Sequence, residues 1–123
     1  MEFDPLSNRV IGLMPEVHRE LGPGLLESAY QACLAHELKA AQMSFAAEVP
    51  LPVHYKGLML DCAYRMDFVI ENKLVLELKS VDSLLPIHEA QLLTYLRLAG
   101  CKTGLLANFN VPLLRQGLKR LVL

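Results

Sequence analysis

Two acidic residues and one lysine in the middle of the chain have the types and spacing needed to hold a divalent cation. Asp67 lies inside one apolar run, residues 66–70, and Glu77 and Lys79 end the next run, residues 74–79. Both runs are typical of β-strands, and the polar triplet between them is typical of a hairpin turn. Two carboxylates facing each other across such a hairpin, with Cβ atoms roughly 5 Å apart, repel unless a cation lies between them.

The register of this hairpin decides whether the two carboxylates meet. If Asn72 is the centre of a three-residue loop, Asp67 lies directly opposite Glu77. One face of the hairpin is then wholly apolar, with Met66, Phe68, Ile70, Leu74, Leu76 and Leu78. The other face carries Arg65, Asp67, Val69, Val75, Glu77 and Lys79. A slip of one residue would place Asp67 and Glu77 on opposite faces.

The triplet Glu77-Leu78-Lys79 is not distinctive by itself, because the same Glu-x-Lys spacing occurs at Glu37-Leu38-Lys39 and Glu71-Asn72-Lys73. The first of these lies in a helical pattern, where residues two apart point away from each other, and the second lies in the turn. Glu77 instead lies in a continuous apolar run, typical of a strand covered on both sides, where a carboxylate is costly unless it is paired or bound to metal. Two interpretations remain: a metal ligand, or a buried ion pair of Glu77 with Lys79 or Arg65.

The elements around the hairpin predict an α/β (α+β) fold. A first helix is capped by Ser7 or Asn8 and runs to Leu21, with Pro15 kinking it or marking where its second part begins. The chain continues with a helix at 25–42, strands at 45–55, 58–70 and 74–81, a helix at 86–99, and strands at 103–109 and 117–122. The three consecutive strands predict an antiparallel meander, with Pro50 and Pro52 confining the first strand to an edge or a bend. The helix after them permits a right-handed crossover into a mixed β-sheet flanked by helices.

Composition indicates one domain spanning residues 1–123. The chain is 53% apolar with a mean hydropathy of +0.30, yet it contains no apolar run of about 18 residues and no signal-peptide pattern. We therefore expect a cytoplasmic protein without a membrane partner, and the high apolar content suggests a homodimer. Cys33, Cys62 and Cys101 form no Cys-x-x-Cys pair, which favours reduced core thiols over disulfides or zinc ligands.

The net charge of −1 hides an asymmetry along the chain. Residues 1–89 carry 13 acidic and 7 basic side chains, whereas residues 90–123 carry no acids and five bases. These bases form either a phosphate-facing rim or an ordinary solvated surface: Arg97, Lys102, Arg115, Lys119 and Arg120. The balance excludes a strongly basic protein that binds nucleic acid irrespective of sequence.

Several motifs together resemble the GxxExxY protein family, and the agreement spans nearly the whole chain. They are Gly22-Pro23-Gly24, Gly24-Leu25-Leu26-Glu27-Ser28-Ala29-Tyr30, Leu60-Asp61-Cys62 with Tyr64-Arg65 and Asp67, Glu77-Leu78-Lys79, Ile87-His88-Glu89-Ala90-Gln91-Leu92-Leu93-Thr94-Tyr95, and Asn108-Phe109-Asn110-Val111-Pro112. This family is similar to the RecB-like branch of the PD-(D/E)XK nuclease superfamily, which implies a restriction-endonuclease-like core. Met66 departs from the superfamily pattern, which has proline there, and Pro15 is not expected in the first helix.

The resemblance implies a metal site built on Asp67 and Glu77, with Lys79 as the catalytic lysine. Glu27 matches the additional acid of the branch, although a carboxylate in the first turn of a helix is also explained by the helix dipole. Mg²⁺ prefers hard oxygen ligands and is usually held by one or two carboxylates plus substrate phosphate. Asp67, Glu77 and the carbonyl of Leu78 supply three such oxygens, and Mn²⁺ is expected to substitute.

The resemblance also implies residues that contact the substrate. Gln91 and Tyr95 match a Gln-x-x-x-Tyr motif on the helix after the triplet, so Gln91 is expected to hold water or phosphate. Tyr95 has two interpretations, substrate packing and core packing. His88, one turn before them, and Arg65 are further candidates for contact with the phosphate backbone.

Three functions follow as hypotheses. The first is a Mg²⁺-dependent nuclease that hydrolyses phosphodiester bonds of DNA, with RNA as the alternative polymer, because the acid-acid-lysine set fits that chemistry. The second is a non-catalytic module that binds nucleic acid or protein and retains the nuclease fold, suggested by the small size and mild charge. The third is a structural subunit completed by another chain.

Overall fold

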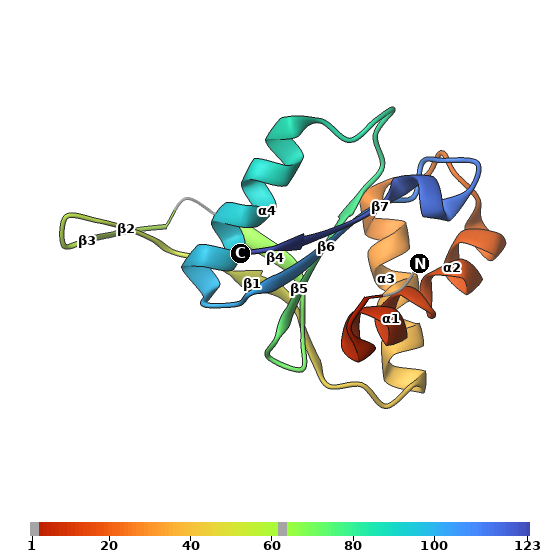
Figure 1. Ribbon diagram of the computed structural model, residues 1–123, viewed down its shortest axis with the longest axis horizontal. Helices are drawn as coiled ribbons and strands as arrows, with labels where there is room; N and C mark the ends of the chain where they lie inside the picture. The colour runs from red at the N-terminus through yellow and green to blue at the C-terminus, as the bar shows by residue number, and fades with distance from the viewer. Residues whose placement is uncertain (1–2, 62–63) are drawn as a thin grey trace.

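The computed structural model describes residues 3–61 and 64–123, and it consists of a five-stranded mixed sheet with helices on both faces (Figure 1). The order of strands in the sheet is β1-β4-β5-β6-β7, and β2 pairs separately with β3. The elements in chain order are α1 (Pro5–Ile11), α2 (Met14–Leu21), α3 (Glu27–Ala40), β1 (Phe45–Pro50), β2 (Val53–Tyr55), β3 (Leu58–Leu60), β4 (Arg65–Ile70), β5 (Leu74–Lys79), α4 (Pro86–Ala99), β6 (Thr103–Asn108), a short 3₁₀ helix η1 (Leu114–Gly117) and β7 (Leu118–Val122).

The connections between strands confirm the predicted α/β architecture. β1, β4 and β5 form an antiparallel meander. α4 then crosses over so that β6 pairs with β5 in parallel, and β7 returns antiparallel to β6. Two neighbouring parallel strands need a crossover connection, usually a helix, because a tight hairpin turn joins only antiparallel strands. This arrangement of a mixed sheet between helices is consistent with a restriction-endonuclease-like fold.

Two hydrophobic cores lie on opposite faces of the sheet. Helices α1 to α3 cover one face, and α4 covers the other (Figure 1). Along β5, Leu76 is buried with α1 to α3 while its neighbour Val75 is buried with Leu92 and Leu96 of α4. β5 is therefore apolar on both faces, as is usual for a central strand beside a parallel neighbour. Glu77 is an exception in this strand, and that makes its position informative.

The N-terminal helix differs from the prediction in its cap and its continuity. Asp4 is the N-cap residue of α1, whereas Ser7 and Asn8 lie inside the helix, so the predicted caps were wrong. The single predicted helix is divided into α1 and α2, and Pro15 lies in the first turn of α2. Proline is tolerated there because the first backbone N–H groups of a helix have no intrahelical partner. Pro15 therefore marks the beginning of the second part, one of the two outcomes expected.

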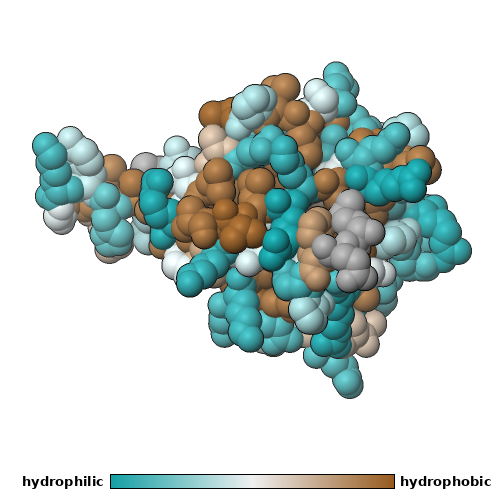
Figure 2. Space-filling view, viewed as in Figure 1, coloured by the Kyte–Doolittle hydropathy of each residue, from teal (hydrophilic) through white to brown (hydrophobic). Residues whose placement is uncertain are grey.

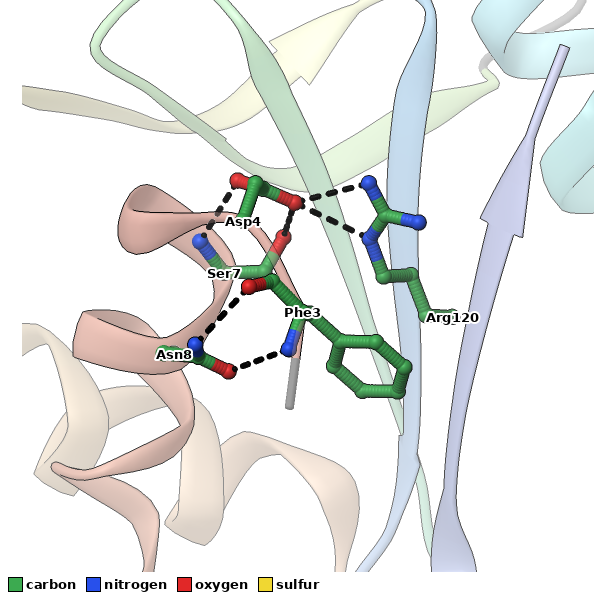
Figure 3. A network of polar contacts seen from close by, with 5 residues as sticks. All are labelled: Phe3, Asp4, Ser7, Asn8 and Arg120. Atoms are coloured by element: carbon green, nitrogen blue, oxygen red, sulfur yellow. Dashed lines mark hydrogen bonds and ion pairs between the residues drawn. The ribbon is translucent and has the colours of Figure 1, made fainter. Parts of the chain in front are cut away.

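A polar network joins this N-terminal segment to the last strand (Figure 3). Asp4 accepts hydrogen bonds from the Ser7 N–H at 3.0 Å and the Ser7 hydroxyl at 2.7 Å, and it pairs with Arg120 of β7 at 2.8 Å. The side chain of Asn8 donates to the carbonyl of Phe3 and accepts from its N–H, both at 2.9 Å. The Arg120 guanidinium lies over the Phe3 ring at 5.3 Å. These contacts, called the N-terminal network below, lower the pKa of Asp4 to about 2, chiefly through the hydrogen bonds from Ser7.

The two long strands predicted at 45–55 and 58–70 are each divided in two. Their distal parts form the β2–β3 arm, residues 53–60, which projects from the body of the molecule (Figures 1 and 2). Its tip is a two-residue turn at Lys56 and Gly57, with φ of 47° and 83°. Pro50 and Pro52 lie where the ladder breaks, as expected for residues that cannot donate a ladder hydrogen bond.

Two remaining expectations concern the cysteines and the membrane. Cys33 and Cys101 are free thiols, as predicted, and Cys62 lies outside the described residues. No helix within residues 3–61 and 64–123 has both the length and the apolar character to cross a bilayer.

Candidate functional site

The hairpin of β4 and β5 has the register that brings the candidate acids together. Phe68 pairs with Leu76, and Ile70 pairs with Leu74, as predicted. The turn is tight because Glu71 and Asn72 both adopt positive φ, 54° and 55°, which matches the right-handed twist of the flanking strands. The same register places Asp67 across from Glu77.

The two carboxylates replace the ordinary ladder just beyond these pairs. The N–H of Asp67 donates to Oε1 of Glu77 at 3.0 Å, and the N–H of Leu78 donates to Oδ2 of Asp67 at 2.8 Å. Each acid therefore takes a backbone donor from the opposite strand. From this point β5 continues beside β6 and β4 continues beside β1. The carboxylates occupy the fork between the two strands, where each is fixed by a charge-assisted hydrogen bond.

The fork also explains a correction to the predicted apolar face. Met66 is buried with Leu51 and Val75 on the α4 side of the sheet, not with Phe68 on the side of α1 to α3. The regular alternation that predicted the opposite face holds only while β4 and β5 remain paired. Beyond Phe68 the strands separate, and Met66 packs against the residues beside α4.

Burial and mutual repulsion make both acids hard to ionise without a cation. Glu77 is 4% exposed, and loss of hydration, followed by the charge of Asp67, raises the pKa of Glu77 to about 8. Burial also raises the pKa of Asp67, the hydrogen bond from Leu78 opposes this, and repulsion from Glu27 adds to it. A divalent cation would reverse both effects by favouring the charged carboxylates.

Neither of the ion pairs considered for Glu77 in the sequence is formed. Within the described part of the chain, the ion pairs join Arg19, Lys119 and Arg120 to other acids, not Lys79 or Arg65 to Glu77. Lys79 is half-buried on the same strand as Glu77, and its charge acts on both acids by lowering their pKa values. Arg65 is exposed at the beginning of β4. The ammonium group of Lys79 is thus near both acids but forms an ion pair with neither.

A loop held by Tyr30 places Glu27 beside the fork. The Tyr30 hydroxyl donates to the carbonyl of Gly22 at 2.6 Å and accepts from the N–H of Leu25 at 3.2 Å, and its ring stacks on Phe109 at 4.7 Å. The hydroxyl of Ser80, just after β5, donates to the carbonyl of Leu25. Glu27 follows this loop as the first residue of α3 and is exposed, and its charge raises the pKa values of Asp67 and Glu77. In the Gly-x-x-Glu-x-x-Tyr motif, Tyr30 therefore holds the loop that positions Glu27.

Glu48 is a fourth acid at the site, and sequence reasoning missed it. The β1–β4 register pairs Ala47 with Phe68 and Val49 with Met66, which places Glu48 opposite Asp67. Its φ of 51° is unusual for a residue within a strand. The charge of Glu48 contributes to the raised pKa of Asp67. The position of Glu48 beside Asp67 follows from the register of β1 against β4. Predicting that register from the sequence would have required the exact register of the arm.

Helix α4 presents the remaining predicted residues, with different surroundings for each. Tyr95 is 6% exposed. Burial is the main cause of its raised pKa, and the charge of Glu77 is the next largest cause, which indicates that the Tyr95 ring lies near the fork. Gln91 is half-buried and lines a groove with Tyr95. Nδ1 of His88 accepts a hydrogen bond from the N–H of Leu85 at 3.0 Å and so caps the first turn of α4. His88 therefore has a structural role beside any contact with substrate.

The five C-terminal bases do not form one free rim. Lys119 pairs with Glu89 at 3.0 Å, and Arg120 pairs with Asp4 in the N-terminal network. Two of the five charges are thereby neutralised locally, because each pair is made with a nearby carboxylate. Arg97 instead lines the same groove as Gln91 and Tyr95.

The donor set fits a hard divalent cation with an incomplete protein shell. No group of three His, Cys, Asp or Glu side chains within residues 3–61 and 64–123 is arranged to hold a metal ion. Asp67, Glu77 and the carbonyl of Leu78 are all oxygen donors, and two carboxylates are enough for Mg²⁺ when waters and phosphate complete the shell. The same set suits zinc poorly, since structural zinc sites are four-coordinate and rich in nitrogen or sulfur.

A helix-flanked mixed sheet with two acids and a lysine at the fork of its central hairpin defines the class of restriction-endonuclease-like folds. The comparisons agree with this assignment. The chain belongs to the PD-(D/E)XK nuclease superfamily, whose family model matches residues 4–121. No curated protein and no solved structure matches the chain. Members of the superfamily are generally nucleases and typically use divalent metals.

Proposed function

We propose that the protein is a Mg²⁺-dependent nuclease that hydrolyses phosphodiester bonds of DNA, and that Mn²⁺ substitutes for Mg²⁺. The observation that carries this proposal is the fork, where Asp67 and Glu77 each hold a backbone donor of the opposite strand and leave further carboxylate lone pairs for a cation. Membership of the nuclease superfamily supports it. We further assign the chain, as a single domain, to the RecB-like branch and to the GxxExxY family, on the strength of its motifs.

In this proposal the cation is held by Asp67, Glu77 and the Leu78 carbonyl, with Glu27 contributing directly or through water. When bound, the cation supplies Lewis acidity and lowers the pKa of a water ligand. Glu27 is exposed whereas Glu77 is buried, so Glu27 suits a water-mediated contact with the cation better than direct coordination. Glu48 adds negative charge on the β1 side and strengthens the demand for a cation.

The remaining residues act on the substrate. Lys79 stabilises the negative charge that develops on the phosphoryl oxygens, or it orients the attacking water. Gln91 holds water or phosphate through its amide, and Tyr95 packs against the substrate. We assign Arg65 and His88 to contact with the phosphate backbone, His88 through the ring nitrogen that does not cap α4.

The test is cleavage of labelled single-stranded and double-stranded DNA, and of RNA, with Mg²⁺ or Mn²⁺. Glu77→Gln and Lys79→Ala are expected to lose at least about 100-fold in rate, in line with the loss of one preorganised charged group at a reacting phosphate. Lys73→Ala is the matched control, because Lys73 belongs to the Glu-x-Lys triplet in the turn. Its rate is expected to equal that of the parent protein.

Equal cleavage by the parent and by Glu77→Gln would mean that a contaminating nuclease is being measured, and the proposal would fail. Binding of nucleic acid that is unaffected by EDTA, without cleavage in Mg²⁺ or Mn²⁺, would instead favour a non-catalytic binding module. Light scattering tests the proposed homodimer separately, and the mass of a monomer would refute it.

A further inference from the structure

A groove beside the fork has the chemistry of a base-binding site. It lies between α4 and the base of the β2–β3 arm and has a volume of about 560 Å³. This is within the range of roughly 300–1,000 Å³ that is typical of small-molecule sites. We call it the α4 groove. Its lining includes His54, Tyr64, Ile87, Gln91, Tyr95 and Arg97.

An aromatic surface is exposed inside the α4 groove. The rings of Tyr64 and Tyr95 are 6.4 Å apart at their centres and tilted by 59°. Tyr95 is almost buried, whereas Tyr64 is 45% exposed and is therefore accessible to a ligand. Ile87, 67% exposed, supplies an apolar part of the lining. Bases stack on such rings in proteins that bind single strands, and the contact is tolerant of sequence because every base has a π-face.

Polar and charged groups are arranged around this apolar surface. Gln91 carries both a donor and an acceptor, which suits the edge of a base. Arg97 is exposed and has no ion pair with any residue in the described ranges, so its guanidinium is available for a phosphate. His54 on the arm adds a second polar group at the exposed side.

Tyr95 connects the lining of the α4 groove with the surroundings of the fork. Tyr95 and Gln91 line the groove, and the pKa of Tyr95, raised mainly by burial, is raised further by the charges of Glu77 and Asp67. Both the groove and the acid pair thus have Tyr95 as a neighbour. In a duplex, by contrast, bases are stacked and paired, and a base must leave the stack to enter a pocket of this kind.

We propose that the α4 groove binds one unpaired base of a single-stranded nucleic acid, stacked on Tyr64, with a neighbouring phosphate on Arg97. The strand then continues from the groove toward Asp67 and Glu77. This inference rests on the proposed function for the direction of the strand. It names the substrate class as single strands, or the unpaired ends and flaps of duplexes.

Binding measured in EDTA tests the inference without requiring cleavage. A fluorescein-labelled single-stranded oligonucleotide is titrated with protein and followed by anisotropy, with the duplex of the same sequence in parallel. Tyr64→Ala is expected to weaken binding by about 5- to 100-fold, the loss typical of one stacked base. Tyr64→Phe retains the ring and is expected to bind within about twofold of the parent, which also shows that the fold is intact.

Two further variants separate stacking from charge and from general surface effects. Tyr55→Ala removes an equally exposed tyrosine from the arm, 56% exposed and outside the groove, and is expected to leave affinity unchanged. Arg97→Ala is expected to weaken binding and to reduce the slope of log affinity against log salt by about 1, the value for one phosphate contact.

Several binding results would overturn the inference. They are a Tyr64→Ala affinity equal to that of Tyr55→Ala, a duplex bound as tightly as the single strand, or a dimer that Tyr64→Ala dissociates, which would make a second copy the occupant. Failure of the proposed nuclease is distinguishable, because binding in EDTA would still depend on Tyr64 while no cleavage appeared with Mg²⁺. Conversely, cleavage that depends on Glu77 but not on Tyr64 would retain the nuclease and refute the groove.

Discussion

The buried charge of Glu77 predicts that the metal-free protein loses stability as the pH rises. The pKa of Glu77 is raised from 4.5 to about 8 in the folded protein. A carboxyl with a higher pKa in the folded state binds its proton more tightly when folded. Well below pH 4.5 the carboxyl is protonated in both states, so its burial costs no free energy of ionisation there. The free energy of unfolding then falls as the pH rises from 4.5 to 8. Because a tenfold change in an ionisation constant is worth about 1.4 kcal/mol, the penalty from this group reaches at most about 4 kcal/mol at pH 8.

Glu77→Gln is the perturbation that tests this reasoning. Glutamine keeps an oxygen that can accept from the N–H of Asp67 but carries no charge. In EDTA we expect the variant to be more stable than the parent by up to about 4 kcal/mol at pH 8, and by less than about 1 kcal/mol at pH 5. The measurement is urea unfolding followed by circular dichroism at several pH values. Glu37→Gln, at a half-buried position of α3 away from the fork, is the control and is expected to give the same small difference at each pH.

Added Mg²⁺ should reduce the stability difference between Glu77→Gln and the parent protein. A cation that binds only the folded state stabilises it by mass action, so the parent should gain stability at pH 8 while Glu77→Gln gains little. A difference between variant and parent that stays constant from pH 5 to pH 8 would show that Glu77 titrates normally. A variant less stable than the parent at pH 8 in EDTA would likewise refute the buried-charge reasoning.

Three further predictions concern the residues that hold the site in place. Asp4→Ala removes the N-cap of α1 and the partner of Arg120, and is expected to cost about 1–2 kcal/mol in urea unfolding at pH 7; an unchanged midpoint would show that the N-terminal network contributes nothing. Gly117→Ala places a Cβ 2.0 Å from the Asn108 carbonyl oxygen and is expected to cost about 1–3 kcal/mol by the same method; a neutral effect would contradict the close approach. Tyr30→Phe keeps the stacked ring but loses the hydroxyl bonded to Gly22, so we expect a loss of about 1 kcal/mol and slower cleavage from a misplaced Glu27; parental stability and rate together would refute that positioning role.

The local features of the fold were predictable because they depend on short-range patterns. The predicted helix at 86–99 matches α4, since a proline begins it and Gly100 ends it in the left-handed conformation. The register of the β4–β5 hairpin was predictable because a three-residue turn leaves little freedom, and with it came the opposition of Asp67 and Glu77. The cap at Asp4 was missed although its signal is local, since Asp4 directly precedes Pro5 at the start of the helix and accepts from the N–H of Ser7.

The register of the arm was the feature that sequence could not supply. A single ladder extending from the turn at Lys56 and Gly57 would place Glu48 opposite Arg65. In the structure Glu48 lies opposite Asp67, because the register differs by two residues between the arm and the β1–β4 ladder. No periodic pattern in the sequence marks this difference. The same offset brings Tyr64 to the α4 groove, so the arm decides both the fourth acid and the proposed base site.

The N-terminal network sets an order of events during synthesis of the chain. Asp67 and the N–H of Leu78 are 11 residues apart, so the fork can form soon after the ribosome has released that hairpin. Asp4 and Arg120 are 116 residues apart, and their contact waits for the last strand. The contacts of the acid pair are thus local in sequence, whereas the anchor of the first helix on β7 requires nearly the whole chain. A stalled or truncated chain that ends before residue 120 would carry a formed hairpin on a body whose first helix is not fastened.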